Sequence, residues 1–130
     1  RVLFRSLKAS TILSLLLDWV YIHMHLLWRI LIMEIQHTIG ASTKLMAVVK
    51  AFSYGNGSAE IARTLAAVKT DYLAVAYVDE GIELRRAGIH LPIMVMSPDE
   101  ADFDAMVAYG LEPEIYSFEI YEQYSITLLH

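Results

Sequence analysis

The sequence predicts an α/β protein in which parallel strands alternate with single helices. Four short apolar runs recur from residue 44 onward, each is followed by a stretch with helical spacing, and the connections are short. Single helices between successive strands produce parallel strands through right-handed crossovers. Because the runs are apolar on both faces, we expect both faces of the sheet to be covered.

The first two strands enclose one helix. Residues 44–52, KLMAVVKAF, form an apolar and partly β-branched run that predicts a buried strand. Residues 71–78, DYLAVAYV, repeat this pattern. The intervening residues 58–69 carry apolar side chains at helical spacing: Ile61, Leu65 and Val68.

The second predicted helix has recognisable ends. It covers residues 79–88, DEGIELRRAG, with Asp79 as the expected N-cap and Gly88 just after its last turn. Arg85 and Arg86 lie near its end. We expect these two arginines to form a solvated helix face rather than to hold a cofactor.

The remaining elements follow the same order. Residues 91–96, LPIMVM, predict a third strand, and residues 97–110 predict a third helix. Either Ser97 or Asp99 can cap this helix, and Gly110 ends it. A short fourth strand and a fourth helix are expected at residues 113–118 and 119–130.

Two architectures contain such units: a doubly wound open sheet and a (β/α) barrel. Four units are half of an eight-unit barrel, which typically needs about 250 residues. The chain has 130 residues. If the fold is a barrel, we expect the chain to be a piece of a larger protein.

Residues 1–43 do not follow the strand and helix alternation. Residues 11–37 have the length of a long helix without a clean polar face, although their Val, Ile and Trp content also suits strands. We expect an apolar, helical N-terminal segment. A membrane span is disfavoured because Asp18 and Arg29 interrupt the apolar run, whereas a spanning helix needs roughly 20 mostly apolar residues.

The polar and aromatic residues of this segment do not indicate a site. His23 and His25 are two residues apart, which places them on one side of a strand, and no further ligand accompanies them. We therefore predict no metal site. Trp19 and Trp28 are expected to be packing residues rather than a binding surface.

Composition excludes several classes of function. The chain is 56% apolar and 19% charged, which is far from the disordered class. A net charge of −5 and a pI near 5.4 argue against a nucleic-acid partner. The chain has no cysteine, which excludes disulfides and thiolate metal sites and favours a cytoplasmic location.

One charge stands where the first apolar run stops. Lys50 precedes the turn formed by Tyr54, Gly55 and Gly57. A lysine amine in apolar surroundings has a lowered pKa and can attack an aldehyde. The N-terminus of the following helix suits a phosphate. Pyridoxal phosphate carries both groups, although a surface lysine beside an ordinary turn is the commoner meaning of this pattern.

The stretch from Val49 to Gly57, VKAFSYGNG, resembles the cofactor-lysine motif V-K-A-x-x-Y-G-x-G of bacterial alanine racemases. The resemblance continues through residues 71–89 and 91–96 and covers about residues 42–118. It implies a partial (β/α)8 TIM-type barrel with about four βα units. The variant K-A-F-S-Y-G-x-G is also similar to the racemase half of bifunctional proteins that join a UDP-N-acetylmuramoyl-tripeptide:D-alanyl-D-alanine ligase to an alanine racemase.

The resemblance implies a pyridoxal 5′-phosphate-dependent racemase that interconverts L- and D-alanine for peptidoglycan synthesis. Lys50 matches the lysine that binds the cofactor covalently and acts as acid and base on one face of the substrate. Tyr54 matches the tyrosine that hydrogen-bonds the cofactor phosphate. In that family a second base comes from the partner subunit of a homodimer, and the resemblance implies the same here. The residues that supply it and the substrate-carboxylate arginines belong to regions outside this chain, so we expect the chain alone to be inactive.

The resemblance also predicts two parts in the chain. Residues 44–130 correspond to the first part of the racemase N-terminal barrel. Residues 1–43 lack the expected first strand and helix, and their origin stays open between a shifted reading frame and a divergent or fused segment. Two other functions stay open as well: a pyridoxal phosphate-binding barrel of the cofactor-homeostasis type, and a nonfunctional or membrane-associated product.

Overall fold

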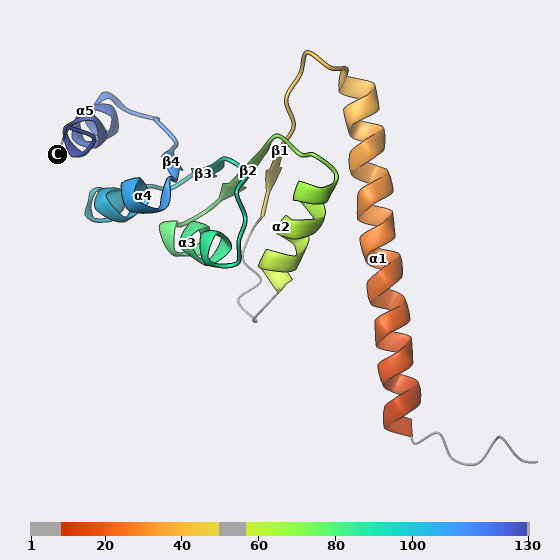
Figure 1. The fold of residues 1–130 in the computed structure, drawn as a ribbon. Coiled ribbons are helices and arrows are strands. Elements are labelled where there is room, and N and C mark those ends of the chain that lie inside the picture. Colours follow the sequence, from red (N-terminus) through yellow and green to blue (C-terminus); the bar gives the residue numbers. More distant parts are fainter. Residues whose placement is uncertain (1–8, 50–56, 130) are drawn as a thin grey trace, which may run out of the picture.

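The structure is a computed structural model that describes residues 9–49 and 57–129. A long helix precedes a parallel sheet whose strands are connected by helices (Figure 1). This confirms the predicted α/β class with a parallel sheet. The elements in chain order are α1 (Ala9–Ile39), β1 (Met46–Val48), α2 (Gly57–Ala67), β2 (Tyr72–Val75), α3 (Val78–Arg86), β3 (Ile93–Val95), the 3-10 helix η1 (Glu100–Asp102), α4 (Phe103–Tyr109), β4 (Glu112–Pro113) and α5 (Phe118–Thr127).

The four strands of the described sheet lie in sequence order, β1-β2-β3-β4, and each is parallel to the next. Ala47 pairs with Leu73, and Leu73 pairs with Ile93, so the register is continuous across three strands. A doubly wound sheet reverses its strand order at a switch point. The described strands show no such reversal, and their order is consistent with part of a barrel.

The core lies between the sheet and its helices. Leu73, Val75, Ile93 and Val95 are fully shielded from solvent. Helices α2, α3 and α4 cover this face, and each packs against the next. They contribute the buried side chains Ala62, Leu65, Leu84, Phe103 and Met106. Each large apolar side chain buried here stabilises the fold by about 1.5–3 kcal/mol.

The opposite face of the sheet is much less covered, and we call it the open face. Side chains alternate between the two faces of a strand, so the register places Met46, Val48, Tyr72, Met94 and Glu112 here, around the buried Ala74. Met46 is 41% exposed and Val48 is 53% exposed. The sheet therefore presents apolar surface on the side away from α2, α3 and α4.

Two glycines end helices as predicted. Gly88 follows α3 with φ +84° and Gly110 follows α4 with φ +61°, both in the left-handed region that favours glycine. The predicted N-cap of α3 is wrong. The cap position is Tyr77 rather than Asp79, and the Glu80 carboxylate accepts hydrogen bonds from the Ala76 and Tyr77 N–H groups at 2.8 and 3.3 Å. Glu80 lies in the third helical position, from which a glutamate reaches back over the helix start.

The third helical segment begins at a cap that was one of the two predicted. Asp99 accepts a hydrogen bond from the Ala101 N–H at 3.2 Å and starts η1, whereas the Ser97 N–H donates to the Ala76 carbonyl. The fourth strand was predicted at residues 113–118, but it consists of Glu112 and Pro113, so the predicted bounds are wrong and share only Pro113 with the structure. After this strand, the Ser117 hydroxyl accepts a hydrogen bond from the Ile120 N–H at 3.2 Å and caps the start of α5.

The prediction of a solvated arginine face is wrong for Arg85. Its guanidinium group donates to four backbone carbonyls, those of Ile89, Leu91, Tyr109 and Gly110, at 2.6–3.0 Å. Desolvation by burial lowers the pKa of Arg85 from its ordinary value. One side chain thus ties the end of α3 to the loops that enter β3 and β4.

Arg86 lies beside it and is exposed. It donates to the Tyr109 hydroxyl at 3.2 Å, and its guanidinium carbon lies 5.7 Å from the centre of the Tyr109 ring. For Arg86 the predicted exposure is confirmed.

Helix α1 confirms the predicted helical N-terminal segment and packs against α2 (Figure 1). The Gln36 amide donates to the Lys69 carbonyl at 2.9 Å, His25 Nδ1 lies 2.8 Å from the Thr64 hydroxyl, and Ile32 is 7% exposed. Because the segment is helical, His23 and His25 do not share a face as they would on a strand. No group of three metal-ligating side chains occurs among the described residues.

By length and composition alone, one helix in the described part of the chain could cross a membrane. It is Thr11–Ile39 of α1, with a mean hydropathy of 1.4 in its most apolar window. Only 6% of that window is buried. The helix therefore exposes most of its apolar side chains.

Replacing Arg85 tests its role in holding the loops. Arg85→Lys is expected to lower the free energy of unfolding by about 2–4 kcal/mol, because an ammonium group cannot reach four carbonyls that the planar guanidinium serves. Arg86→Lys is the matched control and should change it by about 0.5 kcal/mol or less. Urea unfolding measures both, and equal effects of the two variants would contradict the assignment.

Thr70 gives a prediction of the opposite sign. Its side chain is 2% exposed, and its hydroxyl has no hydrogen-bond partner among the described residues. Thr70→Val keeps the shape and removes the unsatisfied hydroxyl, so we expect a gain of about 1 kcal/mol in the free energy of unfolding. Thr38→Val, at an exposed hydroxyl bonded to the Glu34 carbonyl, serves as the control in the same urea titration and should be neutral or destabilising.

Candidate active site at the carboxyl edge of the sheet

The two residues predicted to form the site, Lys50 and Tyr54, lie outside the described residues. Their flanks are described. Val49 directly precedes Lys50, is 5% exposed, and donates its N–H to the Ala74 carbonyl at 2.8 Å. Helix α2 begins at Gly57. The described chain thus leaves the sheet beside β2 and returns at the start of a helix.

Backbone hydrogen bonds extend the parallel ladder past the other strands. The Met96 N–H donates to the Val75 carbonyl at 2.9 Å, and the Glu114 N–H donates to the Val95 carbonyl at 2.8 Å. All four strands therefore end along one line, which we call the carboxyl edge. Functional groups of parallel α/β folds gather at this edge because the loops that follow the strands surround it.

The described side chains of the carboxyl edge are apolar, aromatic, acidic or hydroxyl-bearing. By alternation, Ala76, Met96 and Glu114 continue the open face at this edge. Tyr77 and Tyr116 follow two of the strands and are 63% and 62% exposed. No lysine or arginine occurs among the described residues 76–77, 96–99 and 114–117.

The N-terminus of α2, which follows the segment that contains Lys50, has one feature that favours a bound anion and one that competes with it. Residues Gly57 to Glu60 form the first turn of α2, whose N–H groups lack partners within the helix. This arrangement favours an anion. Glu60 lies in the same turn, however, and its carboxylate also benefits from the positive end of the helix.

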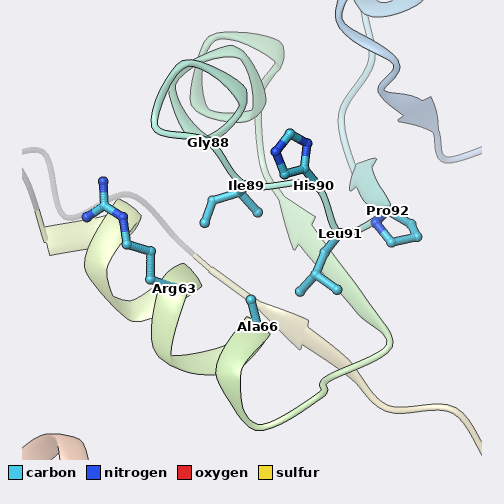
Figure 2. Close-up of a pocket in the computed structure, with 7 residues that line it drawn as sticks. All are labelled: Arg63, Ala66, Gly88, Ile89, His90, Leu91 and Pro92. Atoms are coloured by element: carbon cyan, nitrogen blue, oxygen red, sulfur yellow. The ribbon is translucent and has the colours of Figure 1, made fainter.

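A shallow pocket of about 390 Å³ lies at the other end of the strands, next to the amino end of β3. Figure 2 shows that its lining side chains come from α2 and from the segment between α3 and β3. None of the predicted site residues contributes to it. The residues that line it are Arg63, Ala66, Gly88, Ile89, His90, Leu91 and Pro92.

The sequence does not predict one polar contact at this amino end of the strands. The Tyr72 hydroxyl on β2 donates to the Glu112 carboxylate on β4, across β3 on the open face. This hydrogen bond raises the pKa of Tyr72 above its ordinary value, with smaller contributions from desolvation and from the charge of Glu112. Both residues are the first of their strands, but two residues 40 positions apart give no local signal for such a pair.

The fold and this edge define a parallel β/α domain of the class that carries its chemistry on the loops after its strands. Comparison with protein families matches residues 32–129 to "Alanine racemase, N-terminal domain". The chain belongs to the family of alanine racemase N-terminal domains. The matched region begins inside α1 and includes the whole sheet.

Two curated relatives illustrate the similarity. The alanine racemase of Synechocystis sp. is 39% identical over 100 residues, which are 74% of this chain and 26% of that protein. The alanine racemase of Halothermothrix orenii is 37% identical over 83 residues, which are 63% of this chain and 22% of that protein. The chain therefore spans about a quarter of the length of these relatives.

Solved structures show the same fold. An alanine racemase of Clostridium difficile superposes with a TM-score of 0.64 and 35% identity, covering 69% of this chain and 24% of that one. An alanine racemase of E. faecalis superposes with a TM-score of 0.59 and 36% identity, covering 66% and 24%. The family and the sheet therefore agree with the resemblance found in the sequence.

The Tyr72 contact predicts a pH dependence of stability. A hydroxyl whose pKa is raised by folding stabilises the protein below its unfolded pKa of about 10, and this contribution is lost as pH rises through the folded pKa. Tyr72→Phe should therefore lower the melting temperature at neutral pH, and the difference from the wild type should shrink above about pH 10. Circular dichroism melts across this range measure it, and curves that stay parallel would contradict the assignment.

Proposed function

We propose that this chain is the cofactor-bearing part of a pyridoxal phosphate-dependent alanine racemase that interconverts L- and D-alanine. The observation that carries the proposal is the segment from Val49 to Gly57 with its family motif, joined at its start to the carboxyl end of β1 and at its end to α2. Membership of the alanine racemase family and relatives that are named alanine racemases support it.

Lys50 is the proposed catalytic residue. It directly follows Val49, which is buried on the helix side of the sheet where the ladder reaches its carboxyl end. The described residues that follow β2 and β3 on the open face at this edge, Ala76 and Met96, are apolar. Apolar neighbours of this kind disfavour an ammonium ion and favour the free amine, which is the form that attacks an aldehyde.

The described residues fit the ring of the cofactor better than its phosphate. The side chains of Ala74, Ala76 and Met96 on the open face are small or apolar, while the described part of the edge carries no cation. We propose that Tyr54 binds the phosphate through its hydroxyl group. The N–H groups at the start of α2 are a second possible contact with the phosphate.

Pyridoxal phosphate, when bound, supplies the electron sink that makes the α-hydrogen of alanine acidic. Lys50 would hold the cofactor and exchange a proton with one face of the α-carbon through its Nζ. Racemisation also needs a proton transfer on the opposite face, which one lysine cannot serve efficiently. We propose that a second base comes from the partner subunit of a homodimer.

The complete barrel, the location and fusion of the protein, and the boundary of its first part are proposals too. A complete (β/α)8 barrel would continue the order β1-β2-β3-β4 and cover the open face. We propose a cytoplasmic enzyme whose D-alanine enters peptidoglycan, and a racemase half fused to a ligase of the UDP-N-acetylmuramoyl-tripeptide type. We also propose the boundary between residues 43 and 44, with the first part divergent, fused or translated in a shifted frame, which the coding DNA would distinguish.

Lys50→Ala tests the assigned role in the longest natural protein that contains these 130 residues. Loss of the amine should remove the visible absorbance of the bound cofactor and lower alanine racemisation by roughly 10³-fold or more, because a group that acts covalently cannot be replaced by its neighbours. Lys44→Ala, at an exposed lysine just before β1, is the matched control and should leave both unchanged.

The two readouts separate the alternatives. Racemisation that survives Lys50→Ala would exclude the assigned role. Cofactor absorbance without racemisation in the wild type would favour a pyridoxal phosphate-binding barrel of the cofactor-homeostasis type. A wild type that shows neither would favour a nonfunctional product.

A further inference from the structure

Helix α1 presents an apolar surface that no other described residue covers. Successive residues of an α-helix are about 100° apart, so one broad side of α1 carries a series of large apolar side chains. Each of them is between 46% and 62% exposed. We call this side the outward face, and it consists of Ile12, Leu13, Leu16, Leu17, Val20, Leu27, Ile30 and Leu31.

The opposite side of α1 holds the contacts with the rest of the protein. His25, Ile32 and Gln36 contact α2 or its C-terminal end, and Arg29 lines a shallow groove between the two helices. Helical spacing places Asp18 on this same side, two turns before His25. The two charges that interrupt the apolar run in the sequence therefore both lie away from the outward face.

One polar residue lies on the outward face, and its ring is engaged. His23 Nδ1 is 2.7 Å from the Trp19 carbonyl oxygen, and the rings of His23 and Trp19 are 3.9 Å apart. From Ile12 to Leu31, the described side chains of the face carry no Asp, Glu, Lys or Arg. This series of apolar side chains, with His23 within it and Glu34 one turn beyond its end, is longer than the scattered apolar exposure of ordinary soluble proteins.

The packing on α2 excludes a transmembrane orientation for α1. Contacts with α2 and its C-terminal end run from His25 to Gln36. The part of the helix that precedes these contacts, residues 9–24, rises about 24 Å. The hydrocarbon core of a bilayer is about 30 Å thick. A docked α1 can therefore lie along a membrane but cannot cross it.

Charge distribution points to a lipid surface rather than to a protein. Residues 1–43 contain four cations and two carboxylates, which gives them a net charge of +2. Because the whole chain has a net charge of −5, residues 44–130 have a net charge of −7. Three of these cations, Arg1, Arg5 and Lys8, immediately precede α1. Basic residues beside an apolar helix face are attracted to anionic headgroups, whereas the acidic remainder is repelled by them.

The two tryptophans agree with this orientation. Trp19 and Trp28 are half a turn apart in helical angle, so they lie on the two flanks of the outward face. They are 59% and 46% exposed, so the expectation that they are packing residues is wrong. Tryptophan favours the boundary between headgroups and acyl chains, and both flanks reach that boundary when a helix lies in the membrane plane. A second copy of α1 or a protein groove would cover a narrower stripe of the helix.

We propose that α1 lies in the plane of an anionic membrane surface, with the outward face among the acyl chains and α2 on the aqueous side. The earlier expectation that a membrane is disfavoured concerned a span and rested on Asp18 and Arg29, which both lie on the α2 side. This membrane contact does not depend on the racemase activity.

Vesicle flotation of the longest natural protein that contains these residues tests the proposal. The wild type should float with vesicles of equal parts phosphatidylcholine and phosphatidylglycerol. Because both tryptophans of the chain lie on α1, their emission should shift to shorter wavelength at the same time. The triple variant Leu16→Glu, Val20→Glu, Leu27→Glu should lower partitioning at least about tenfold per residue.

Matched variants identify the cause. The triple variant Val107→Glu, Ile126→Glu, Leu129→Glu adds the same charge at exposed apolar positions outside α1 and should float nearly as the wild type. Replacing Arg1, Arg5 and Lys8 by Gln should weaken binding to the anionic vesicles more than to pure phosphatidylcholine. This variant changes none of the residues of α1 itself.

Three results would overturn the proposal. The first is a wild type that does not bind the anionic vesicles. The second is equal partitioning of the outward-face variant and the wild type. The third is a wild type that is oligomeric without lipid and becomes monomeric in the outward-face variant, which would show that a second copy covers the face.

Discussion

The structure depends on an unbroken parallel ladder. The bonds from the Val49, Met96 and Glu114 N–H groups to neighbouring strands bring four chain segments to the same line, although they are far apart in sequence. Because the ladder fixes where each strand ends, it also fixes where the loops begin. The proposed chemistry of the Lys50 segment depends on this line, since an amine is useful only where loops from several strands can surround a ligand.

Local sequence patterns were sufficient for the order and type of the elements. The apolar runs at residues 44–52, 71–78 and 91–96 each contain an observed strand, and Gly88 and Gly110 adopt the left-handed backbone that ends a helix. These features depend on neighbours within a few residues, so a linear sequence reveals them. The family motif added the candidate site, because spacing alone could not separate it from a surface lysine before a turn.

Features set by distant partners could not be predicted. The sequence predicts that Arg85 is a surface residue of a helix. Only the fold brings the carbonyls of Tyr109 and Gly110 to its side chain. Tyr72 and Glu112 meet across a whole strand for the same reason. The orientation of α1 is also set by tertiary packing. The sequence shows the charge of Asp18 but does not show that this side of α1 faces α2.

The two edges of the sheet differ in how easily they can accept another strand. At the β4 edge the strand is only two residues long. The Glu114 N–H bonds inward to β3, so the backbone N–H of the preceding residue would point outward. That residue is Pro113, which has no N–H. At the β1 edge, Met46 and Val48 keep both backbone groups. Within the described sheet, addition of a foreign strand is therefore favoured at β1, because the β4 edge lacks one outward N–H group.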